Sequence, residues 1–152
     1  MAISSGKLSS VEATRAILDR ISEYGETLAC VARFDPDTAL QDAAVADAEL
    51  ARGSVRGLLH GVPLAHKDMF YRDGHISGSG SHIRANYMAT STSTALARLD
   101  EAGALDIARL NMVEFAVGGV GGHNSITGTP RNPWNKAYVP GGSSSGAAVA
   151  VA

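Results

Sequence analysis

Apolar residues recur every three or four positions through residues 11–24, which is the spacing of one face of a helix. Ser9 and Glu12 form the pattern of a capping box, in which each side chain satisfies a free N–H group at a helix start. Gly25 follows the last residue of the apolar stripe. The pattern therefore predicts an amphipathic helix that begins after Ser9 and ends near Gly25.

Short apolar segments alternate with two further helical segments. Residues 28–34 have the length and composition of a strand, and Asp35 before Pro36 supplies a cap and a first-turn proline for an alanine-rich helix. Residues 94–102 predict another helix, and residues 104–108 predict a strand after it. This alternation of helices and strands predicts a layered α/β domain.

Lys67 follows a further apolar segment, residues 58–65, which we expect to be an irregular strand because a glycine and a proline lie within it. An ammonium group taken out of water loses proton affinity, and a lysine made neutral in this way can act as a base. The alternative is an ordinary solvated pair of Lys67 and Asp68 at the surface. The apolar residues before Lys67 favour a lysine that is carried out of the core.

Loops rich in glycine and proline occupy much of the second half of the chain. Asn111 with Glu114 repeats the capping-box pattern and predicts a short helix. Residues 118–122 and 128–140 form irregular connections, which inside compact domains are more often functional than accidental. Trp134 stands in the second of these loops, where we expect it to be packed as a plug.

The segment 141–146, Gly-Gly-Ser-Ser-Ser-Gly, turns abruptly into the apolar run of residues 147–152. This is the pattern of a tight loop that enters a buried helix, whose free N–H groups can face an anion. A nucleotide phosphate loop is disfavoured because no Lys-Ser or Lys-Thr pair follows the glycines. Two alternatives stay open at this point, namely residues that only shape the turn and a serine that takes part in acyl transfer.

Length and composition limit the class of protein. With 152 residues and 45% hydrophobic content, the chain fits one soluble globular domain. The 13 Lys and Arg residues nearly balance the 15 Asp and Glu residues, so we expect a small molecule as the partner and neither nucleic acid nor a membrane. Cys30 is the single cysteine, and no secretory signal or membrane-spanning run is present, which predicts a cytoplasmic protein. The histidines lack metal-ligand spacing, so we expect no metal.

Four motifs, in the same order along the chain, resemble the landmarks of the amidase signature family. They are Gly61-x-Pro63-x-x-x-Lys67-Asp68, Asn111-Met112-x-Glu114-Phe115, Asn132-Pro133-Trp134 and the Gly-Gly-Ser-Ser-Ser-Gly segment of residues 141–146. The resemblance implies that residues 1–152 form the N-terminal portion of an amidase signature domain, truncated before the nucleophile segment. It also implies an α/β fold with α/β/α layers and a mixed sheet, here incomplete.

The resemblance further implies the site residues. In the family a lysine, a bridging serine that follows a cis peptide bond and a nucleophilic serine form the catalytic triad. Lys67 matches the lysine and Ser143 matches the bridging serine. The nucleophile and the oxyanion donors match nothing in this chain, so we expect them in a later glycine-rich turn and expect the chain alone to be inactive. The substrate-lining loop of the family corresponds to four residues, Gly118, Gly119, Val120 and Gly121.

The function that the resemblance implies is hydrolysis of a carboxylic amide to an acid and ammonia or an amine, without a cofactor. A close alternative is the amidase subunit of a glutamine-dependent aminoacyl-tRNA amidotransferase, which works with partner subunits. The family also admits a homodimer. A third possibility, from a different class, is a short non-catalytic remnant whose glycine and serine loop holds an anion.

Three sites depart from the usual pattern of the family, of which one, Ser145 in place of a common glycine, is tolerated there. His66 stands before the lysine where an aliphatic residue is usual, and Arg109 with Leu110 stands where lysine and threonine are frequent. We expect these side chains to change the local packing, and His66 in particular to change the burial on which Lys67 depends.

Overall fold

The computed structural model of the protein describes residues 2–117 and 124–152. Three strands form one sheet in the order β1-β3-β2. The central strand β3 (Leu105–Leu110) is antiparallel to β1 (Val31–Phe34) and parallel to β2 (Pro63–Lys67). The prediction of a mixed and incomplete sheet in an α/β fold is therefore confirmed.

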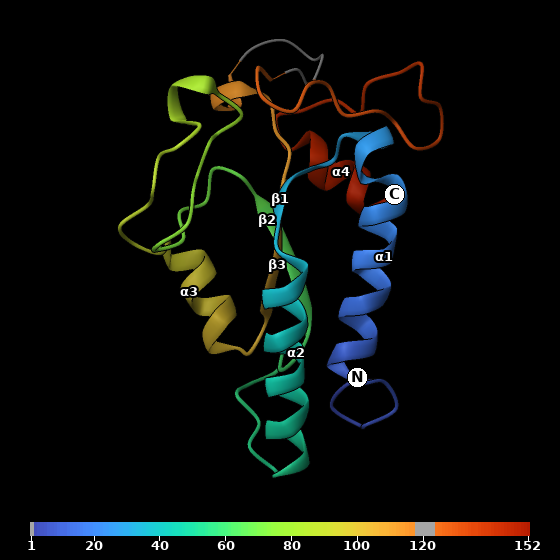
Figure 1. The fold of residues 1–152 in the computed structure, drawn as a ribbon, viewed down its shortest axis with the longest axis vertical. Helices are drawn as coiled ribbons and strands as arrows, with labels where there is room; N and C mark the ends of the chain where they lie inside the picture. The colour runs from blue at the N-terminus through green and yellow to red at the C-terminus, as the bar shows by residue number, and fades with distance from the viewer. Residues whose placement is uncertain (1, 118–123) are drawn as a thin grey trace.

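Helices lie on both sides of these strands. Figure 1 shows the strands between α1 and α3, with α2 in front of the sheet. α1 and α2 pack against each other and against the sheet. In the described part of the chain, no helix has the length and apolar character needed to span a bilayer. The helices are α1 (Ser10–Leu28), α2 (Pro36–Ala51), α3 (Thr94–Glu101) and α4 (Ser145–Val151), with single 3-10 turns η1 (His82–Arg84) and η2 (Glu114–Ala116).

The main core lies where α1 and α2 cover the sheet. The buried face of α2 consists of Ala39, Ala43 and Ala46, each at most 1% exposed. Because alanine side chains are short, α2 can approach β3 closely, and Leu105 and Ile107 of β3 fill the space between them. This packing fixes β3, and through it the two strands on either side.

The start of α1 forms as the sequence predicts, but its end does not. The Ser9 hydroxyl accepts from the Glu12 N–H at 3.0 Å, and the Glu12 carboxylate accepts from the Ser9 N–H at 2.8 Å. The helix continues through Gly25 to Leu28 and ends where Ala29 takes a left-handed conformation with φ 50°. The expectation that the helix ends near Gly25 is wrong, because a glycine inside a helix costs only about 1 kcal/mol.

Residues 58–65 are only partly a strand, because the first half of this segment forms turns. The Val62 N–H donates to the Leu59 carbonyl at 2.9 Å, and Gly61 takes a left-handed conformation with φ 71°. The strand β2 therefore begins at Pro63 and includes Lys67 as its last residue.

The predicted capping box of Asn111 and Glu114 does not form. The N-cap residue of the 3-10 turn η2 is Val113, and no side chain forms a capping hydrogen bond there. Phe115 lies in the left-handed region with φ 51°, which prevents a regular helix at this place. The Asn111 side chain is used elsewhere, as described below.

Candidate functional site

The candidate site lies at the carboxyl end of the two parallel strands. Lys67 ends β2, and Asn111 comes directly after β3, so both lie at the same edge of the sheet. The loop before α4 is fastened to this edge by two backbone hydrogen bonds. The Gly146 N–H donates to the Asn111 carbonyl at 2.9 Å, and the Val113 N–H donates to the Ser143 carbonyl at 3.0 Å.

This arrangement brings together the lysine and the serine that the sequence motifs single out. The Lys67 Nζ donates to the Ser143 Oγ at 2.6 Å, across 76 positions of sequence. Both residues are half-buried, and the peptide bond between Gly142 and Ser143 is cis. The two side chains can therefore exchange a proton directly.

The surroundings favour the neutral form of the lysine. Burial lowers the pKa of the Lys67 ammonium below its ordinary value of 10.5, because desolvation penalises the charged form. The Ser143 hydroxyl is the acceptor that the structure gives the Nζ group. Among the described residues, no carboxylate lies within ion-pair distance of Lys67, so no negative charge at such a distance opposes this shift.

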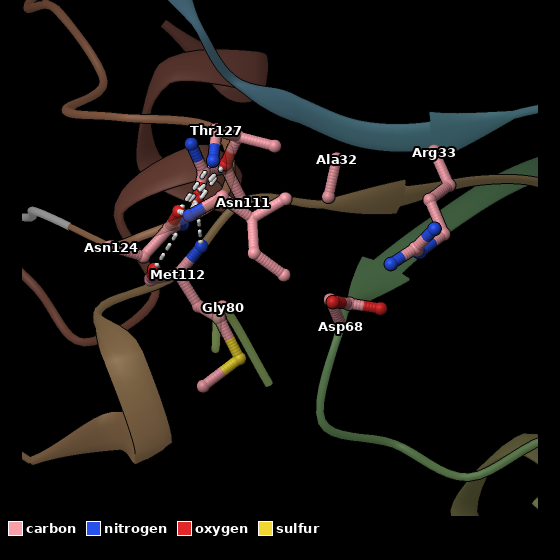
Figure 2. Close-up of a pocket in the computed structure, with 9 residues that line it drawn as sticks. Ala32, Arg33, Asp68, Gly80, Asn111, Met112, Asn124 and Thr127 are labelled. Atoms are coloured by element: carbon pink, nitrogen blue, oxygen red, sulfur yellow. Dashed lines mark hydrogen bonds between the residues drawn. The ribbon is translucent and has the colours of Figure 1, made fainter. Parts of the chain in front are cut away.

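Asn111 is the residue that joins the elements around this site, a role that the sequence analysis missed. It is fully buried, and its Nδ2 donates to the Ala29 carbonyl at 2.7 Å. Its Oδ1 accepts from the Met112 N–H at 2.7 Å and from the Asn124 side chain. The end of α1, the end of β3 and the loop after residue 123 are therefore held by one side chain. The two asparagines and their hydrogen bonds are visible in Figure 2.

Replacing Asn111 by alanine is expected to destabilise the protein by about 2–4 kcal/mol, because buried polar groups of Ala29 and Met112 lose their partner. Urea denaturation followed by circular dichroism measures this loss. Asn135→Ala is the matched control, because Asn135 is exposed and its side chain only accepts from the Ala137 N–H. An Asn111→Ala variant as stable as the control would contradict the role given to Asn111.

Asp68, next to the lysine, is buried and organises a neighbouring loop. It is 2% exposed, and its carbonyl accepts from the Ser79 N–H at 3.1 Å and the Ser77 Oγ at 3.2 Å. Burial raises the pKa of the Asp68 carboxyl, although the charge of Arg33 and the N–H groups of two glycines oppose that shift. The Lys67–Asp68 pair is thus not a solvated surface pair, and this alternative is excluded.

Among the described residues, two hollows are found, and neither is lined by Lys67 or Ser143. The smaller has a volume of about 40 Å³, with Asp68 and Arg33 at one end and Asn111 and Asn124 at the other (Figure 2). A volume of this size holds roughly two or three water molecules, which is too little for an organic substrate. The larger, about 450 Å³, lies between β1, α2 and residues 72–88.

Some expected site features lie elsewhere or outside the described residues. Gly118, Gly119, Val120 and Gly121 lie outside the described residues. Trp134 is 84% exposed, so the expectation that it is packed as a plug is wrong. Its loop is instead shaped by the Asn132 side chain, which accepts from the Trp134 N–H at 3.0 Å. Within residues 2–117 and 124–152, no group of three or more His, Cys, Asp or Glu side chains is arranged to hold a metal ion.

Comparison with known sequences identifies similar proteins along almost the whole chain. The sequence profile of the family described as Amidase matches residues 12–152. One subunit of the glutamyl-tRNA(Gln) amidotransferase of Thiobacillus denitrificans, designated A, is 42% identical over 146 residues, which is 96% of this chain and 30% of that protein. The corresponding protein of Geobacter sulfurreducens is 44% identical, with the same coverage.

Comparison with solved structures also identifies amidases. The peptide amidase from Stenotrophomonas maltophilia matches with a TM-score of 0.90 and 34% identity, over 99% of this chain and 32% of the other. A fatty acid amide hydrolase matches with a TM-score of 0.88 and 27% identity, over 95% of this chain and 26% of the other. The chain thus spans about 30% of the length of the curated relatives it matches.

Proposed function

Because the chain belongs to the amidase signature family, we propose that it supplies the general base and the proton-relaying serine of an enzyme that hydrolyses carboxylic amides. The observation that carries this proposal is the 2.6 Å contact between Lys67 Nζ and Ser143 Oγ, together with the lowered pKa of the lysine. A neutral amine within hydrogen-bond distance of a hydroxyl is the arrangement that activates a nucleophile by proton relay.

In the proposed reaction two coupled proton transfers lead from the nucleophile through Ser143 to Lys67. A nucleophilic serine gives its proton to the Ser143 oxygen while the Ser143 proton passes to the neutral Lys67 amine. The serine oxygen then bonds to the amide carbon, and the C–N bond breaks as the leaving nitrogen takes the proton back through the same two groups. Water hydrolyses the resulting ester and regenerates the serine.

The nucleophile and the oxyanion donors are proposed to come from a segment that these 152 residues do not include. The four residues of segment 118–121, Gly118, Gly119, Val120 and Gly121, are proposed to line the substrate. They follow the turn of Glu114–Ala116, whose place is fixed by the Phe115 N–H donating to the Ser79 carbonyl at 2.9 Å. The lone and buried Cys30 supports a protein that works in the reducing cytoplasm.

Ser143→Ala tests this function in the protein made from the whole reading frame that encodes the chain. The expected result is a fall in amide turnover of about 10²-fold or more, because the relay between the nucleophile and Lys67 is cut. Ser54→Ala, at an exposed serine after α2, is the matched control and is expected to keep full activity. The purified 152-residue chain is expected to show no turnover.

An amidase subunit of an aminoacyl-tRNA amidotransferase is the second candidate, and the two curated relatives described above favour it. The same Lys67 and Ser143 would then release ammonia from glutamine for a partner subunit. Release of ammonia only in the presence of partner subunits and tRNA would support this function against simple hydrolysis. If the whole protein shows neither activity, the non-catalytic remnant is the remaining alternative.

A further inference from the structure

We infer that His66 is a positioning residue for Lys67, because it joins the carbonyl group of the lysine to a buried charged cluster around Asp106. The inference rests on the proposed function of Lys67 and names a device that holds that lysine in place. His66 precedes Lys67 in β2, and its side chain is only 5% exposed.

The first contact is made by the Nδ1 atom of the ring. It lies 3.1 Å from the Lys67 carbonyl oxygen, which also accepts from the N–H groups of Met69 at 2.8 Å and Phe70 at 3.1 Å. A carbonyl oxygen only accepts, so the His66 Nδ1 must carry a proton to bond there. Three donors thus converge on the carbonyl from which the chain turns out of β2.

The second contact is made by the other ring nitrogen. The Nε2 atom lies 3.4 Å from the Asp106 Oδ1 in the neighbouring strand β3. The other carboxylate oxygen of Asp106, Oδ2, forms ion pairs with the Arg72 Nε at 2.8 Å and the Arg109 Nη2 at 2.9 Å. Burial opposes ionisation of Asp106, but the contact with His66 and the charges of Arg109 and Arg72 outweigh it, and the pKa of the carboxyl lies below its ordinary value.

The cluster reaches a separate helix. Arg72 makes a two-pronged ion pair with Asp100 of α3, at 2.7 and 3.0 Å. Asp106 is therefore held by two arginines, one of which is itself anchored on α3. An unbroken series of polar contacts runs from α3 through Arg72 and Asp106 to His66, and from its ring to the carbonyl of Lys67.

Polar substitutions of similar shape can separate the two contacts of the ring. In His66→Asn the amide nitrogen stands near the place of Nδ1 and can still donate to the Lys67 carbonyl. In His66→Gln the amide nitrogen reaches the place of Nε2 and can contact only Asp106. His66→Leu fills the volume without donating to either group. If the carbonyl contact positions the lysine, only His66→Asn should preserve its function.

The first measurement needs no enzyme activity. In the ¹⁵N-labelled protein made from the whole reading frame, NMR of the imidazole is expected to show a proton on Nδ1 of His66. The pH midpoint for acetylation of Lys67 by acetic anhydride, followed by mass spectrometry, is expected to rise by about half a unit or more in His66→Gln and His66→Leu, because the displaced amine becomes better solvated. It is expected to stay near the wild-type value in His66→Asn.

The second measurement uses the protein from the whole reading frame. His66→Gln and His66→Leu are expected to lower kcat about tenfold or more with KM little changed, and His66→Asn to stay within about threefold of wild type. A ring protonated only on Nε2, or equal Lys67 midpoints in all three variants, would overturn the inference. A Lys67→Ala variant that keeps its turnover would instead overturn the proposed function, whatever the His66 variants do.

Discussion

Lys67→Ala is expected to lower amide turnover about 10³-fold, since the variant lacks the group that takes the proton from Ser143. Lys67→Arg is expected to be equally inactive although it keeps the positive charge, because a guanidinium does not lose its proton in proteins. Steady-state kinetics of ammonia or amine release from the whole protein measures both effects. Lys136→Ala is the matched control, because Lys136 is exposed and lies in the loop of residues 128–140.

The pH dependence of the same reaction has a definite sign. Burial lowers the pKa of the Lys67 ammonium, and the neutral amine is the active form. Turnover is therefore expected to rise with pH through the lowered pKa of Lys67 and to level off above it. This rising limb should be absent from the residual activity of Lys67→Ala. A variant with the same rising limb as the wild type would show that another group is the base.

Among the glycines that the structure describes, Gly146→Ala is expected to be the most destabilising methyl addition, at about 3 kcal/mol or more. A Cβ atom at this position would lie 2.3 Å from the Cys30 carbonyl oxygen and 2.5 Å from the Asn111 nitrogen. All of these neighbours are backbone atoms, so no flexible side chain can move aside. The loop before α4 would have to leave the sheet edge, and with it the Ser143 hydroxyl.

Gly25→Ala is the matched control, and it is expected to change stability in the opposite direction. Gly25 lies inside α1, where an added Cβ meets only the Ile21 methyl group at an ordinary distance of 3.5 Å. The substitution should stabilise the protein by about 0.5–1 kcal/mol. Urea denaturation of the two variants measures both effects, and a Gly146→Ala variant as stable as the wild type would contradict the close packing of α4 on the sheet edge.

Local patterns predicted those parts of the fold whose partners are close in sequence. The capping box of Ser9 and Glu12 joins residues three positions apart, and Asp35 caps α2 in the same way. Both depend on hydrogen bonds within one helical turn, which the sequence displays directly. The alternation of helices and strands likewise predicted the class of fold, and the four ordered motifs indicated the family, which the comparisons confirm.

Longer-range contacts could not be predicted from spacing. Asn111 has the right neighbour for a capping box, but its side chain bonds to Ala29, 82 positions away, and to Asn124. The tertiary partners compete with the local cap and win, because an unpaired buried carbonyl costs more than a missing cap. The exposure of Trp134 is unpredictable for a related reason, since a large apolar side chain alone does not show whether a partner surface lies over it.

The candidate site could be predicted only in part from the sequence. The spacing of Lys67 and Ser143 in the sequence does not show that their side chains are in contact. The resemblance to a family predicts this contact, and the structure contains it. No motif or family resemblance predicts the contact of His66 with Asp106. The sequence shows only that His66 is unusual for its position. The register of β2 and β3 pairs His66 with Arg109, and the contact with Asp106 follows from the placement of the side chains.

The ionisation of Lys67 in the intact chain tests the account most directly. Lysine labelled with ¹³C at the ε carbon gives a resonance for Lys67 that is identified by its loss in Lys67→Arg, and its shift is followed against pH by NMR. The expected titration midpoint of the Lys67 amine lies below the ordinary lysine value of 10.5. A Lys67 amine that titrates at 10.5 or above would show that its surroundings do not favour the neutral form, which contradicts its role as the base.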